Sequence, residues 1–154
     1  MKPLKTTVEE VLRTAIQLEV ATRLLYQKLA ERGANAAVKK KLNELADVQL
    51  VHRAKLERKY KETIGKSAPE PEIPKIELQW DVSDLDMPKA LKIALEHERE
   101  SESNYRFLAE RVPNTELGGL FMELAELKWK HKVEIQAEYD KSSFDPERFL
   151  LDMG

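Results

Sequence analysis

The heptapeptide LAERGAN at residues 29–35 recurs as LAERVPN at residues 108–114, 79 positions further along the chain. Outward from this peptide the match continues without a gap, and the matched pairs are Glu19 with Glu98, Tyr26 with Tyr105 and His52 with His131. A fixed offset over this length indicates an internal duplication. Each copy carries a Glu and a His, which are both metal-binding residue types. The duplication can therefore bring two of each to one pseudo-twofold site.

The composition sets the class of protein. The chain has 154 residues, of which 35% are charged and 42% hydrophobic, and it contains five glycines, a balance that suits one domain of amphipathic helices. The net charge of −2 gives no overall field that would attract nucleic acid or a membrane surface, so we expect neither as a partner. The absence of cysteine excludes disulfides and thiolate metal sites. No apolar run approaches the ~20 residues of a membrane span and no signal core opens the chain, so we expect a cytoplasmic protein.

Four segments repeat their buried positions at alternating spacings of three and four, which is typical of helices in a bundle. The two copies span about residues 7–64 and 86–141, and each should fold as a hairpin of two helices joined by a few residues. The positions expected to share the buried face are Val8, Leu12, Ala15, Glu19, Thr22, Tyr26 and Leu29; Val38, Leu42, Leu45, Gln49, His52 and Leu56; Leu91, Ala94, Glu98, Ser101, Tyr105 and Leu108; Leu117, Phe121, Leu124, Lys128, His131 and Ile135. His97 lies beside this face and is expected to be exposed.

The linker at residues 65–85 decides the topology. Its prolines prevent a continuous helix. A helix of ~28 residues is about 42 Å long, whereas the extended linker can reach about 75 Å. The linker can therefore run the length of the bundle, so that the second and third helices are parallel. We predict one all-α domain over residues 1–154, a ferritin-like four-helix bundle of two hairpins with one long crossover and a short C-terminal helix after Pro146.

The pattern Glu-x6-Tyr in the first helix of each hairpin, followed by a histidine in the second, resembles the ferritin-like di-iron proteins, and among them the rubrerythrin-type domains. The resemblance covers about residues 7–141. It implies that the metal ligands are Glu19, His52, Glu98 and His131, with Tyr26 and Tyr105 beside the site carboxylates. The two bridging glutamates of that family would fall at Gln49 and Lys128, so both are replaced.

Two further features of related proteins are missing from the sequence. Rubrerythrins also carry a cysteine-rich rubredoxin module, which this chain lacks. The haem-binding methionine of the bacterioferritins would fall at Leu50, so we expect no haem.

Charge balance limits the metal content. Four carboxylates would neutralise two divalent ions, but this site retains two carboxylates and gains the ammonium of Lys128, so two ions would leave about three uncompensated positive charges. We therefore expect at most one iron or other transition metal per chain, or none. Without metal, one protonated histidine would make the cluster neutral. With one metal, a deprotonated Lys128 would do the same.

Three functions remain open at this point. The first is an oxidoreductase or peroxide-scavenging protein that uses one metal. The second is a metal-free structural or interaction protein with a Glu-His-Lys polar cluster. The third is a subunit of an iron-storage cage, against which the altered metal site argues. The sequence identifies no substrate or redox partner and does not decide whether the protein is an enzyme. We expect a homodimer, with Trp80 and Phe149–Leu151 in the core or covered by the second subunit.

Overall fold

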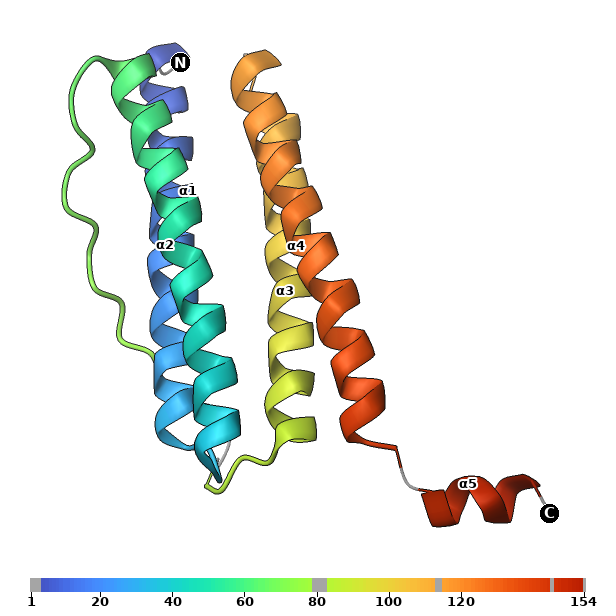
Figure 1. Ribbon diagram of the computed structural model, residues 1–154. Coiled ribbons are helices and arrows are strands. Elements are labelled where there is room, and N and C mark those ends of the chain that lie inside the picture. The colour runs from blue at the N-terminus through green and yellow to red at the C-terminus, as the bar shows by residue number, and fades with distance from the viewer. Residues whose placement is uncertain (1–3, 79–82, 113–114, 145, 154) are drawn as a thin grey trace.

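Four long helices form two antiparallel hairpins, as predicted, and a short helix follows them (Figure 1). The computed structural model describes residues 4–78, 83–112, 115–144 and 146–153. The helices are α1 (Leu4–Glu31), α2 (Ala36–Ile64), α3 (Met87–Arg111), α4 (Thr115–Ser142) and α5 (Pro146–Met153). The linker between α2 and α3 runs back along the outside of the first hairpin, so α2 and α3 point the same way and α1 and α4 point the other way (Figure 1).

The helix ends follow local signals in the sequence. The Asn35 side chain accepts a hydrogen bond from the backbone of Val38, and Asp86 does the same for Lys89 at the start of α3. Gly65 ends α2 with a φ of 91°, a left-handed conformation that glycine adopts without strain. The first helix begins at Leu4, earlier than residue 7, where the first copy was predicted to start. Residues 113–114, between α3 and α4, lie outside the described residues.

The linker is attached to the first hairpin at both of its ends and along α1. Leu85 pairs with the α1–α2 turn through two backbone hydrogen bonds, each of 2.8 Å. Further along, the side chains of Gln17 and Lys28 donate to linker carbonyl groups, each at 2.6 Å. These contacts hold an extended segment in place where prolines exclude a helix. Trp80 lies outside the described residues.

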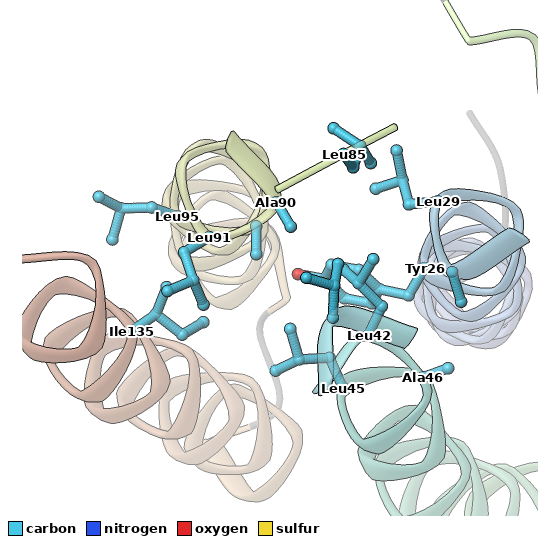
Figure 2. Packing of buried hydrophobic residues seen from close by; sticks show 13 residues of the cluster. Tyr26, Leu29, Leu42, Leu45, Ala46, Leu85, Ala90, Leu91, Leu95 and Ile135 are labelled. Carbon is cyan, nitrogen blue, oxygen red and sulfur yellow. The ribbon is translucent and has the colours of Figure 1, made fainter. Parts of the chain in front are cut away.

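The interior consists of two apolar clusters separated by a polar layer. Figure 2 shows the first cluster, in which Leu42 and Leu45 of α2 point toward Leu91 of α3 and Ile135 of α4. The second cluster is formed around Leu12, Leu56, Phe121 and their neighbours. The polar layer contains Glu19, Thr22, Gln49, His52, Glu98, Ser101 and Lys128, all buried. All the predicted buried-face positions are buried except His131, whose side chain is 21% exposed.

The short helix α5 extends away from the bundle (Figure 1). Leu150 and Leu151 are 67% and 79% exposed, so they are not part of the core of a single chain. The side chain of Phe149 lies outside the described residues. Within the described part of the chain, no helix is long and apolar enough to cross a membrane.

Candidate functional site

Lys128 of α4 lies at the centre of the polar layer and is fully buried. Its ammonium donates a hydrogen bond to Oε1 of Gln49 at 2.7 Å. Nζ also lies 3.6 Å from Oε1 of Glu19 and 3.9 Å from Oε2 of Glu98. The 4,3 spacing predicts this inward position and the ion pairs, and both are confirmed. One positive charge therefore lies between two carboxylates that come from different hairpins.

Each carboxylate also accepts a hydrogen bond from a tyrosine of the other hairpin. The hydroxyl of Tyr105 donates to Oε1 of Glu19, and the hydroxyl of Tyr26 donates to Oε1 of Glu98 at 2.9 Å. Burial, together with the adjacent carboxylate, raises the pKa of both tyrosines well above the ordinary value. The two phenols therefore stay protonated and act as donors, and they connect the hairpins reciprocally.

The two histidines lie next to the carboxylates on the α2 and α4 side of the layer. Nδ1 of His52 is 3.6 Å from Oε2 of Glu19, and Nδ1 of His131 is 3.7 Å from Oε2 of Glu98. Both distances exceed those of a hydrogen bond. The imidazole rings stack with their centroids 5.8 Å apart. Among the described residues, none of these four atoms has a hydrogen-bond partner, although all four are buried.

The carboxylates are ionised despite their burial. Burial alone would raise the pKa of Glu19, but the neighbouring His52 and the charge of Lys128 outweigh it and hold the pKa below its usual value. The pKa of Glu98 is lowered in the same way, since His131, Lys128 and the Tyr26 hydroxyl outweigh the effect of burial. With neutral histidines the cluster carries a charge of −1.

The donor set does not fit two metal ions. The resemblance implies a bridging carboxylate at position 49, but the amide of Gln49 there accepts from Lys128 and donates to the carbonyl of Leu45 at 3.0 Å. The ammonium of Lys128 lies between the two carboxylates that remain. Throughout the described part of the chain, no group of three or more His, Cys, Asp or Glu side chains is arranged to hold a metal. What remains in each half is one Glu and one His whose unpaired atoms lie close together.

His97 was expected to be exposed, and the structure shows that this is wrong. Its Nε2 lies 3.0 Å from the hydroxyl of Thr22, and its ring packs edge-on against Tyr26 with centroids 5.8 Å apart. Burial lowers its pKa. The flank of α3 that bears His97 packs against α1, so a position adjacent to the predicted buried face is partly covered. His97 therefore helps to hold the ring of Tyr26 in place.

Comparison with known proteins gave one family and one solved structure of note. Residues 10–139 match the family model described as Rubrerythrin. A hypothetical protein from Pyrococcus furiosus has a similar structure, with a TM-score of 0.61 and 29% sequence identity over 86% of this chain and 87% of that chain. A search of curated proteins gave no match. The span that matches the family contains every residue of the buried cluster.

Proposed function

Because the chain belongs to the rubrerythrin family through its ferritin-like domain at residues 10–139, we propose that it is a member in which an ion cluster replaces the two-metal centre. The observation that carries this proposal is the position of the Lys128 ammonium, 3.6 Å from Glu19 and 3.9 Å from Glu98. A protein side chain thereby provides the positive charge that metal would otherwise bring. The function is then that of a structural or interaction protein, not of a di-iron oxidoreductase.

The charges and contacts of the cluster support this function. Two divalent ions added to two carboxylates and one ammonium would leave about three uncompensated positive charges in a buried site, which is prohibitively costly. The same groups without metal come close to neutrality, each carboxylate accepts a hydrogen bond from a tyrosine, and Lys128 donates one to Gln49. Since every long helix contributes at least one group, the cluster fixes the placement of the two hairpins. A rigid, fixed bundle suits a protein that presents its surface to a partner.

Metal analysis of the purified protein tests the proposal. After expression with added iron or manganese, and after dialysis against a weak chelator, we expect less than one tightly bound transition metal per chain. The control is the double variant Gln49→Glu with Lys128→Glu, carried through the same preparation. Two tightly bound ions per chain in the wild type would contradict the proposal.

A second candidate is a protein that binds one metal, and the unpaired buried atoms favour it. Oε2 of Glu19 with Nδ1 of His52, or the matched atoms of Glu98 and His131, would hold the ion. A metal bound there would supply a Lewis-acid or redox centre. The ligand histidine would bind the ion through its neutral form.

Titration with cobalt(II) separates the two candidates, because its visible absorption reports coordination directly. A single-metal site predicts one equivalent per chain, which His52→Gln abolishes if the ion lies beside Glu19 and His131→Gln abolishes if it lies beside Glu98. The binding should also weaken at acidic pH as the imidazoles take up protons. The ion cluster predicts no saturable absorption in the wild type.

A further inference from the structure

The internal duplication places different charges at one pair of matched positions. In the second hairpin, the carboxylate of Glu102 accepts hydrogen bonds from Lys132 at 2.8 Å and from Arg106 at 2.9 Å. The positions 79 residues before Glu102 and Lys132 are Arg23 on α1 and Arg53 on α2. The first hairpin thus has two guanidinium groups where the second has an acid and a base. The first hairpin lacks a carboxylate at the position that matches Glu102.

A cavity of about 180 Å³ lies at this place in the first hairpin. Besides the two arginines, it is lined by Glu19 and Gln49 of the buried cluster, by Leu50 and by Ile73 of the linker. Its volume far exceeds the roughly 10–15 Å³ that one water needs. Ile73 is 82% exposed, so the linker covers this cavity only lightly. The cavity therefore offers both charged and apolar walls to a small molecule.

One nitrogen of the Arg23 guanidinium is not satisfied by the described residues. Its Nε is buried and has no hydrogen-bond partner among the described residues. A buried donor without a partner is destabilising, and most such groups are paired with protein, water or ligand. Arg53 donates from its Nε to Glu57 on the same helix at 3.2 Å. Its other two guanidinium nitrogens are not used in that contact.

We propose that this cavity binds a small molecule with a carboxylate group, which takes the place that Glu102 occupies in the second hairpin. Guanidinium groups match a carboxylate in shape and can donate two parallel hydrogen bonds to it. The aliphatic part of the ligand would pack against Leu50 and Ile73. The ligand would bind through the two arginines, which are not among the residues expected to hold metal.

The charge of Glu19 does not prevent this binding. Its carboxylate already accepts from Tyr105 and lies 3.6 Å from both the Lys128 ammonium and the His52 ring. The charged side chains that line the cavity are Arg23 and Arg53, which are positive, and Glu19, which is negative. They sum to +1, which favours an anion.

Calorimetric titration and thermal unfolding with acetate and butyrate, at constant ionic strength and pH 7, test the site. We expect saturable binding of the carboxylates by the wild type and a melting temperature that rises with ligand concentration. Arg23→Met should weaken binding at least about tenfold, because it removes a charge-assisted hydrogen bond. Arg58→Met, which alters an exposed arginine of α2, is the matched control and should bind as the wild type does. Absence of saturable binding, an equal response of the Arg23→Met variant, or tighter binding of phosphate than of either carboxylate would overturn the proposal.

Arg23→Glu provides a test that does not depend on choosing the right ligand. It places a carboxylate opposite Arg53 and so copies the Glu102–Lys132 pair of the second hairpin. We expect this variant to melt at a higher temperature than Arg23→Met without ligand, and to show no response to acetate or butyrate. A melting temperature below that of Arg23→Met would show that the two hairpins do not share this geometry, and the proposal would fail.

Discussion

Replacing Lys128 by methionine removes the ammonium while keeping most of the side-chain volume. In the wild type this group is fully buried and lies 3.6 Å and 3.9 Å from two carboxylates. Without it, Glu19 and Glu98 would share the site with no permanent cation. Removing one partner of a buried ion pair costs about 3–5 kcal/mol. For a chain of this length, the melting temperature should fall by roughly 6–20 °C.

Urea unfolding at pH 7, followed by circular dichroism, measures the change in the free energy of unfolding. Lys130→Met, at an exposed neighbouring position of α4, is the control and should stay within about 0.5 kcal/mol of the wild type. Adding Glu98→Gln to Lys128→Met should recover part of the loss, because only one buried negative charge then remains. The assigned role of the ammonium would be refuted by a Lys128→Met variant within about 1 kcal/mol of the wild type, with no recovery in the double variant.

Three other outcomes are expected. Gln49→Glu combined with Lys128→Glu should destabilise the metal-free protein, because four buried carboxylates repel one another. Added iron(II) or manganese(II) should raise the melting temperature of this variant more than that of the wild type. A folded variant with no thermal response would mean that the Glu and His side chains do not converge. The lowered pKa values of Glu19 and Glu98 stabilise the fold above their unfolded pKa of about 4.3, and this stability is lost as the pH falls through the folded pKa values. The urea midpoint should therefore be lower at pH 3 than at pH 6. The difference between the two midpoints should be smaller in the Glu19→Gln variant. Native mass spectrometry should give a dimer that deletion of residues 146–153 weakens, because α5 exposes apolar side chains; a large multimer would indicate a cage instead.

Much of the fold could be predicted because its signals are local and repeated. The 4,3 spacing identified the buried face of each long helix, and this face is buried in the structure with His131 as the partial exception. Asp86 and Gly65 marked helix ends through capping chemistry that acts over a few residues. The crossover followed from the length of the linker alone. The start of α1 was predicted near residue 7, whereas the helix begins at Leu4.

The site was predictable where it lies on the buried face and not where it lies on the flanks. Lys128 was placed correctly because its register is fixed by apolar neighbours above and below it. His97 was missed because the extent of contact between α1 and α3 is a tertiary property. Arg23 and Arg53 were missed because charged residues beside a buried face usually point to solvent. A signal was nevertheless present, since position 23 differs in charge from the matched Glu102 within an otherwise well-aligned repeat.

The substitutions at positions 49 and 128 work together physically. A glutamate at 49 beside Lys128 would place three carboxylates around one ammonium and raise the buried net charge to −2. Lysine at both positions would neutralise Glu19 and Glu98 but force two ammonium groups into one space. Gln49 avoids both arrangements, because its neutral oxygen accepts from Lys128 at 2.7 Å, closer than either carboxylate approaches the ammonium. Lys128 therefore attracts both carboxylates without displacing the tyrosine hydroxyl from either. The pseudo-twofold site is thus stabilised by two different residues, Gln49 and Lys128, at matched positions of the repeat.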